Sequence, residues 1–142
     1  GDFLTAYGGA GKALGQLQEP VGINIDIQGY IRIADTWNRR IQLFDVNLLA
    51  ISQFTVSGWE GMGILNKPYL ASLPDGTLVA SDPEKHRILH ISADGQLLAS
   101  IGRLGNDAYS LNLPVGIAID PEGHIFVADS GNSRIIRYDS LP

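Results

Sequence analysis

Short hydrophobic runs and short polar runs follow each other along the chain, and glycine, proline or aspartate separates most of them. Runs of this length that are rich in Ile, Val, Leu and Phe are typical of β-strands. Several runs are hydrophobic at consecutive positions, as in Ile88-Leu89 and Ile135-Ile136, which predicts sheets covered on both faces. The runs that predict strands are 3–7, 21–26, 30–35, 40–45, 48–56, 69–73, 77–81, 87–92, 96–101, 115–120, 125–129 and 134–139.

The pattern repeats with a period of 47 residues. Tyr30–Asp45 reads as a strand, a polar turn and a second strand, and it recurs at Thr77–Ser92 and His124–Asp139. A period of this size indicates stacked supersecondary units. The positions that keep the register are Gly29, Gly76 and Gly123, then Asp35, Asp82 and Asp129, then Arg40, Arg87 and Arg134.

Each complete unit contains four short strands joined by tight turns, which predicts the four-stranded antiparallel blades of an all-β propeller. We assign residues 20–57 to the first blade, 58–102 to the second and 103–142 to a third blade that has only three strands. Residues 1–19 are expected to supply an outer strand and a loop that complete the last blade of a ring.

The phase of the repeat supports that assignment. Phe3–Pro20 and Leu97–Pro114 are equally long and lie two periods apart, so Phe3–Tyr7 is expected to be a fourth strand that precedes its own first blade. Three blades are fewer than the roughly four to eight of propellers, and an open arc would expose apolar faces and strand edges. We therefore predict a two-fold homodimer, a six-bladed ring in which Phe3–Tyr7 completes the partner's third blade. The alternative is that the chain is half of a longer propeller.

Two segments carry a family resemblance. Pro114–Asp139, which reads PVGIAIDPEGHIFVADSGNSRIIRYD, resembles the NHL repeat closely, as does Pro20–Asp45 with VGINID, IADTWNRRI and LFD. The middle repeat departs from the pattern, because KPYLASLPDG is one residue shorter than LPVGIAIDPEG. It also has Lys85 where the other repeats have asparagine and Leu73 where they have aspartate.

The resemblance covers nearly the whole chain and implies a six-bladed propeller family that is used mainly for binding. Its members recognise proteins or RNA or serve as extracellular sensors, and a metal-dependent lyase that completes peptide amidation has the same architecture. A shared fold does not choose among these functions.

The composition of the chain limits the partners and the chemistry that we expect. The net charge of −5 and pI of about 4.9 lack the positive footprint of a nucleic-acid binder, so nucleic acid is the least favoured partner. The chain has no cysteine for thiolate chemistry, and no hydrophobic run approaches the ~20 residues that cross a bilayer. The glycine-rich segment Gly8–Lys12 lacks the spacing of a phosphate-binding loop and is interpreted as a turn. We expect a bacterial protein without a cofactor; the sequence does not fix its compartment.

The repeated acids and arginines could be acid–base groups with positioning arginines. We favour a structural role for Asp35, Asp82 and Asp129 and for Arg40, Arg87 and Arg134. Aspartate at a strand end commonly bonds turn amides, and an active site rarely needs one group three times.

Histidines do not suggest a metal site. His86, His90 and His124 fall at unrelated blade positions, whereas metal ligands must converge on one point.

Five other residues are the candidates for ligand contact: Trp37, Trp59, Tyr69, Asn24 and Asp26. The three aromatic residues lie near turns and crossovers, and could form an aromatic rim or pack between blades. The polar pair lies on an inner strand facing a channel, and Asn24 is alanine in the other repeats. The sequence thus predicts a non-enzymatic binding or scaffold module. The alternative is a metal-dependent lyase or hydrolase whose channel site uses Asn24, Asp26 and Asp120.

Overall fold

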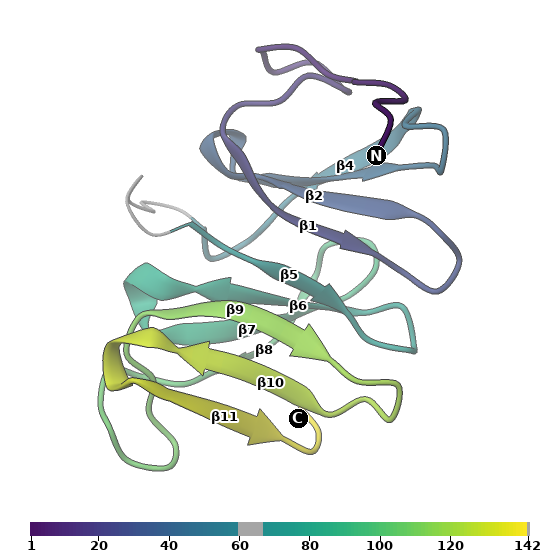
Figure 1. The fold of residues 1–142 in the computed structure, drawn as a ribbon. Helices are drawn as coiled ribbons and strands as arrows, with labels where there is room; N and C mark the ends of the chain where they lie inside the picture. The colour runs from purple at the N-terminus through teal and green to yellow at the C-terminus, as the bar shows by residue number, and fades with distance from the viewer. Residues whose placement is uncertain (60–66, 142) are drawn as a thin grey trace.

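The computed structural model describes residues 1–59 and 67–141, and it contains three antiparallel sheets in chain order (Figure 1). Blade 1 comprises β1–β4, blade 2 comprises β5–β8 and blade 3 comprises β9–β11. The strands are β1 (Pro20–Ile25), β2 (Ile31–Asp35), β3 (Arg40–Phe44), β4 (Ala50–Thr55), β5 (Leu70–Ser72), β6 (Leu78–Asp82), β7 (Arg87–Ile91), β8 (Leu97–Ile101), β9 (Pro114–Ile119), β10 (Ile125–Asp129) and β11 (Arg134–Tyr138).

The predicted all-β propeller architecture is confirmed. Within each blade the strands pair in sequence order, and the blades stack face to face (Figure 1). The second and third strands of every blade are joined by a one-turn 3-10 helix: η1 (Thr36–Asn38), η2 (Pro83–Lys85) and η3 (Ser130–Asn132). We call the end of the fold that carries these turns and the crossovers between blades the turn rim. No helix among the described residues has the length and apolar character needed to span a membrane.

Two hydrophobic cores lie between the blades, and blade 2, which takes part in both, is covered on both of its faces. The first core joins blade 1 to blade 2 around the fully buried Trp59, and the second joins blade 2 to blade 3 around Leu111. Residues at 47-residue spacing occupy equivalent places, as Ile41 and Ile88 do with no exposed surface. The period in the sequence is therefore the spacing of the inter-blade contacts.

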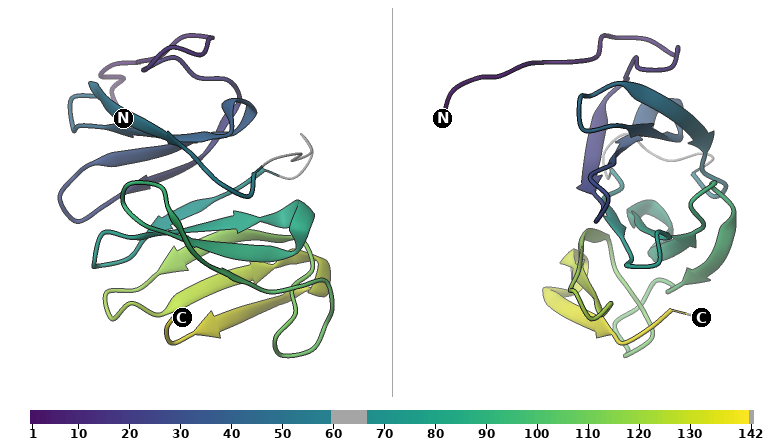
Figure 2. Two further views of the ribbon diagram at one scale, coloured as in Figure 1. Left: turned by 180° about the vertical axis from the view of Figure 1, so that it is seen from behind. Right: turned by 90° about the vertical axis from the view of Figure 1, so that its right-hand side faces the viewer.

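Two details of the fold differ from the predicted elements. The inner strand of blade 2, β5, has three residues where β1 and β9 have six, which fits the residue missing from KPYLASLPDG. The predicted strand over Phe3–Tyr7 is not formed in the single chain: residues 1–9 pair with no strand and run out from blade 1 (Figure 2). A strand needs a neighbour for its backbone hydrogen bonds, and the described part of this chain offers that segment none. The predicted crossover at 58–67 lies largely outside the described residues.

Candidate functional site

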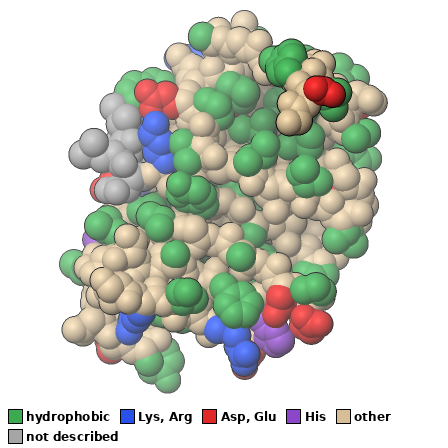
Figure 3. All heavy atoms as spheres, in the orientation of Figure 1, with side chains coloured by type: hydrophobic (Ala, Val, Ile, Leu, Met, Phe, Trp, Pro, Cys, Tyr) green, Lys and Arg blue, Asp and Glu red, His purple; other side chains and the backbone are tan. Residues whose placement is uncertain are grey.

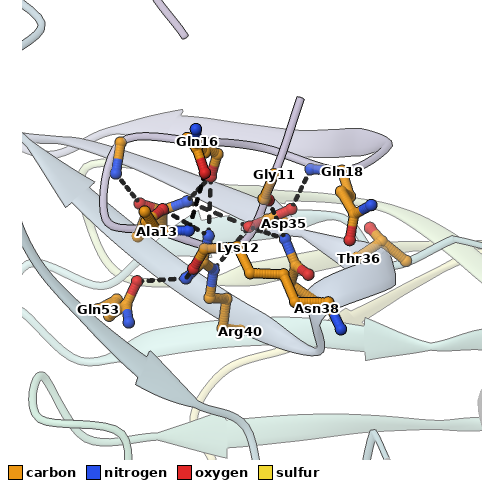
Figure 4. Close-up of polar contacts among 12 residues, drawn as sticks. Gly11, Lys12, Ala13, Gln16, Gln18, Asp35, Thr36, Asn38, Arg40 and Gln53 are labelled. Atoms are coloured by element: carbon orange, nitrogen blue, oxygen red, sulfur yellow. Dashed lines mark hydrogen bonds and ion pairs between the residues drawn. The ribbon is translucent and has the colours of Figure 1, made fainter. Parts of the chain in front are cut away.

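Asp35 is the centre of a polar network where β2 enters its 3-10 turn (Figure 4). Its carboxylate is fully buried and accepts hydrogen bonds from Arg40 Nε at 2.6 Å and Asn38 Nδ2 at 2.9 Å. The backbone N–H of Gln18 donates to its other oxygen at 2.7 Å. Gln42 Nε2 also donates to this carboxylate at 3.1 Å, so four donors hold the turn against the loop that precedes β1.

The arginine extends this network to the crossover loop (Figure 4). Arg40 donates to the carbonyl oxygens of Lys12 at 2.6 Å, Ala13 at 3.1 Å and Gln16 at 2.8 Å. We call this arrangement of aspartate, arginine and asparagine the crossover clamp, because it ties the crossover into a blade to that blade's own 3-10 turn.

Blade 3 repeats the clamp. Asp129 accepts from Arg134 Nε at 2.7 Å, from Asn132 Nδ2 at 2.7 Å and from the N–H of Asn112 at 2.6 Å. Arg134 in turn donates to carbonyl oxygens of the loop before β9, including that of Ser110 at 2.8 Å. The repeated acids and arginines are therefore occupied by contacts within the fold, which is the arrangement that a structural role requires.

In blade 2 fewer contacts of the clamp lie among the described residues. Asp82 accepts from Arg87 Nε at 2.8 Å, but Lys85 replaces the asparagine, and no donor among the described residues reaches Asp82 Oδ1. Burial accordingly raises the pKa of the Asp82 carboxyl. Burial also acts on Asp129, but hydrogen bonds, first from the Asn112 N–H and then from its side-chain donors, hold the pKa of that carboxyl below its ordinary value.

The two inner-strand candidates have local partners. Asp26 is buried, forms an ion pair with Arg32, and accepts hydrogen bonds from the N–H groups of Gln28 at 3.0 Å and Tyr30 at 2.9 Å. It therefore holds the turn between β1 and β2. Asn24 is half-buried and accepts a hydrogen bond from Ser72 of β5, so it joins the inner strands of two blades.

The three aromatic candidates differ in how far they are buried. Trp59 is fully buried in the core between blades 1 and 2, so it takes the packing role that was its alternative and is not accessible to a ligand. Trp37 is 50% exposed in η1, and Tyr69 is 43% exposed just before β5. Both lie on the turn rim.

An ion pair that the sequence did not reveal lies near Trp37 in space and near Tyr69 along the chain. Trp37 borders a shallow depression of about 270 Å³, whose other lining residues are Ala10, Leu17, Gln18 and Glu19. Glu19 Oε2 also lies 2.6 Å from Lys67 Nζ, two positions before Tyr69. The backbone of Tyr69 is fixed by Ser81, which donates its N–H to the Tyr69 carbonyl at 3.0 Å. We call these four residues, Trp37, Glu19, Lys67 and Tyr69, the aromatic rim site.

Each histidine has its own partner, as their unrelated positions suggested. His86 Nδ1 accepts from the Leu113 N–H at 3.2 Å, and His90 Nε2 lies 2.9 Å from Thr77 Oγ1. His124 Nδ1 lies 2.8 Å from Asp120 Oδ2.

Asp120, Glu122 and His124 form the cluster of metal-type ligands present in the described part of the chain, with ligand atoms within 4.8 Å of one another. It lies in the turn between β9 and β10 and was not singled out from the sequence. Acids around an exposed turn are common without an ion. The hydrogen bond with His124 accounts for one contact of the Asp120 carboxylate.

Another buried polar residue, Gln42, also escaped the sequence reasoning. Its amide accepts a hydrogen bond from the Gly15 N–H at 2.8 Å and donates to the Gln16 carbonyl at 2.6 Å. The equivalent residues of the other blades are Leu89 and Ile136. That polar exception within an apolar column was the signal that could have identified it.

Comparisons with known proteins agree with the repeat. The NHL repeat family matches residues 111–138. The brain tumor protein of Drosophila melanogaster is 30% identical over 139 residues, and the B-box type zinc finger protein ncl-1 of Caenorhabditis elegans is 31% identical over 139 residues. Each alignment covers 96% of this chain, but only 13% and 16% of those two proteins, so the chain spans a small part of their length.

Solved structures agree on the fold. A streptogramin B lyase matches with a TM-score of 0.56 and 18% identity, over 87% of this chain and 41% of the lyase. A protein of unknown function from Bacteroides thetaiotaomicron matches with a TM-score of 0.63 and 20% identity, over 78% of this chain and 30% of that one. At such identity these likenesses bear on the fold alone. Together, the 47-residue period, the crossover clamp and the sequence matches make this chain a member of the NHL-repeat family.

Proposed function

We propose that this chain is a non-enzymatic binding or scaffolding propeller module, which acts as a homodimer and holds a protein or peptide ligand on the turn rim. One observation carries the proposal: half-exposed aromatic side chains stand at Trp37 and Tyr69, where the equivalent residues of the other blades are glutamate or glycine. A residue that serves the repeat recurs in every blade, whereas a residue that serves a ligand has no reason to recur.

The chemistry of the aromatic rim site suits a peptide. Tryptophan and tyrosine offer a large apolar surface with one polar group, and such residues are enriched at binding hot spots. The Glu19–Lys67 pair of this site is partly exposed and offers one charge of each sign. An extended peptide could stack on the aromatic rings and exchange hydrogen bonds with this pair.

A non-enzymatic role is supported by how the repeated polar groups are used. The buried carboxylates of Asp35, Asp82 and Asp129 each pair with an arginine five residues later. An acid–base catalyst must be within reach of a substrate proton. These carboxylates have no exposed surface, and those of Asp35 and Asp129 bond to the crossovers of their own blades.

The homodimer is supported by the two ends of the arc. Ile135 of blade 3 is 76% exposed, although Ile41 and Ile88 at the same blade position have no exposed surface. At the other end, Ile23 of β1 is 64% exposed, although Leu70 at its position in blade 2 is only 5% exposed. A second copy would cover both apolar faces at once.

Ligand binding can be tested with a phage-displayed library of random linear peptides selected on the purified chain. Selected peptides should lose about tenfold or more in affinity when Trp37→Ala or Tyr69→Ala is introduced, as expected for hot-spot aromatic residues. Tyr109→Ala is the matched control, because Tyr109 is an exposed aromatic residue in the crossover before blade 3. Peptides that bind all three variants as tightly as the parent chain would place the ligand elsewhere.

The alternative, a metal-dependent lyase or hydrolase with its site in the central channel, draws on the fold shared with streptogramin B lyase. Plasma mass spectrometry of the purified chain separates the two functions. A binding module should carry only trace metal after dialysis. Zinc or calcium that stays bound at one ion per chain would overturn the non-enzymatic proposal.

A further inference from the structure

We propose that a second copy of this chain pairs its residues 3–7 with the free edge of β11 in one defined register, Tyr7 opposite Ile135 and Thr5 opposite Arg137. Its blade 1 then covers the open face of blade 3. This inference rests on the homodimer proposed above and specifies the contacts that form it.

The outer edge of β11 has no partner strand among the described residues. In blades 1 and 2 the third strand, β3 or β7, pairs with a fourth strand, but among the described residues β11 pairs only with β10. An open edge presents unpaired N–H and C=O groups and invites another strand. In the described part of the chain, blade 3 thus has one strand fewer than blades 1 and 2, and residues 1–9 pair with no strand.

The complete blades fix the register. β3 pairs with β4 through Leu43 opposite Ser52, and β7 pairs with β8 through His90 opposite Ala99. These pairs are one period apart. On the third strand, Leu43 and His90 are therefore equivalent, and the equivalent residue of blade 3 is Arg137. The fourth-strand residue equivalent to Ser52 and Ala99 is Thr5, by the same period counted backwards.

A bulge sharpens this assignment. Both complete blades shift register just after the pair described above, so Ile51 and Leu98 have no opposite residue. The equivalent residue of the N-terminal segment is Leu4. The same shift then places Phe3 opposite Tyr138.

The N-terminal segment already leaves blade 1 in the required position. The ring of Tyr7 contacts that of Phe44 edge-on, with centroids 5.8 Å apart and planes at 77°. Phe54 and Ile101, the equivalents of Tyr7, each pack against the core at the face of the following blade. The loop after Tyr7 also bridges Ala10 to Leu17, as the complete crossover bridges Leu104 to Leu111.

The open face of blade 3 has the shape that a neighbouring blade requires. It holds an apolar hollow of about 250 Å³, lined by Gly116, Ile117, Ala118, Phe126, Ala128 and Ile135. In blade 1 the residue equivalent to Gly116 is Gly22, where an added Cβ would lie 2.9 Å from the Pro68 carbonyl oxygen of blade 2. The corresponding Cβ at Gly116 would meet only Ala128, at 3.8 Å. The space that blade 2 occupies beside Gly22 is thus open beside Gly116.

The face formed by the first strand of each blade is apolar, as expected if blade 1 of one copy packs against blade 3 of another. Hydrophobic side chains are spread over the face formed by β1, β5 and β9 (Figure 3). Ile23 and Ile25 of β1 are mostly exposed. Their blade 3 equivalents, Ile117 and Ile119, pack against the core shared with blade 2, so the same packing is expected for β1 against a second copy.

Cysteine cross-linking tests the register, because the chain has no cysteine of its own. Thr5→Cys chains are mixed with Arg137→Cys chains and mildly oxidised, and disulfide-linked peptides are identified by mass spectrometry. Opposite residues on paired strands have Cβ atoms about 4.5–5.5 Å apart, so we expect a disulfide that joins position 5 of one chain to position 137 of the other. Ala6→Cys chains mixed with Arg137→Cys chains should give little cross-linked product, because Ala6 lies outside the bulge and a one-residue shift points its side chain to the other face.

Two further measurements test the cross-linking method and the contribution of residues 1–7 to the dimer. The Leu43→Cys/Ser52→Cys chain tests the equivalent pair inside blade 1 and should form its disulfide within one chain. Deleting residues 1–7 should raise the dimer dissociation constant about tenfold or more, because it removes several cross-strand pairs.

The outcomes separate this inference from the homodimer. Disulfides between positions 5 and 137 of different chains, together with a weakened deletion variant, support the strand exchange. A dimer that persists without that cross-link, while the blade 1 control forms its disulfide, overturns the exchange and leaves the homodimer standing. So does a deletion variant that dimerises as tightly as the parent. A chain that stays monomeric overturns both.

Discussion

Asp82 and Asp129 occupy the same position in two blades and differ in the donors that reach them among the described residues. Asp129 accepts from an arginine, an asparagine side chain and a backbone N–H. Asp82 has its arginine but stands beside Lys85 in place of that asparagine. Burial raises the pKa of Asp82 above the ordinary value of 3.8, whereas at Asp129 the hydrogen bonds outweigh burial and hold the pKa below that value.

These opposite shifts predict opposite pH dependences. The lowered pKa of Asp129 stabilises the fold above pH 3.8, and this contribution is lost as the pH falls through the folded-state pKa. The raised pKa of Asp82 favours its protonated form in the fold, so its contribution is present below pH 3.8 and is lost as the pH rises through the higher folded-state pKa. Asp129→Asn should therefore reduce the free energy of unfolding at pH 7 by about 1–3 kcal/mol more than Asp82→Asn.

Urea unfolding of both variants at pH 7 and at pH 3 measures this difference. The gap between the variants should shrink at the lower pH, where the carboxylates of the parent chain become protonated. Equal losses at pH 7 would contradict the account of the clamp.

Single residues were predictable from the sequence only where they repeat. Asp35 and Arg40 stand out because two other blades carry the same pair. The Glu19–Lys67 contact joins residues 48 positions apart and depends on how one blade lies on the next. Trp59 is the opposite case: an aromatic residue near a crossover fits a ligand site as well as a core, and only its full burial decides between them.

At the scale of the strand, the alternation of apolar runs and turns predicted every strand that the structure forms, to within one or two residues at the ends. The exception is residues 3–7. Their sequence has the pattern of a strand, but a strand is completed by a neighbour, and the neighbour that we propose is β11 of a second copy. Local pattern therefore identifies the segment, while pairing depends on another part of the assembly.

Two glycines allow a matched test at this scale. Gly22→Ala should destabilise the chain by about 1–3 kcal/mol, because the added Cβ meets backbone atoms of blade 2 at 2.9–3.1 Å. Gly116→Ala should leave the unfolding of the isolated chain nearly unchanged, since its Cβ meets only Ala128 at 3.8 Å. It should nevertheless weaken the dimer, because a second copy brings a backbone to that position.

Sedimentation velocity across a dilution series measures that weakening, and urea unfolding measures chain stability. A Gly116→Ala chain that dimerises as tightly as the parent would show that no blade packs against this face as blade 2 packs against Gly22.

For the whole molecule, the sequence predicted three blades and the phase in which they begin. The structure adds that both ends of the row of blades are apolar and exposed, with Ile23 at one end and Ile135 at the other. The repeat in the sequence does not show this. Large exposed apolar patches mark interaction surfaces. Because the two faces have equivalent partners inside the chain, a second copy of the same chain is the partner that we propose for both.

Light scattering after size-exclusion chromatography, at micromolar concentration, tests this central claim most directly. The account predicts a particle of twice the chain mass of 15.3 kDa. A single species with the mass of one chain at every concentration would contradict it.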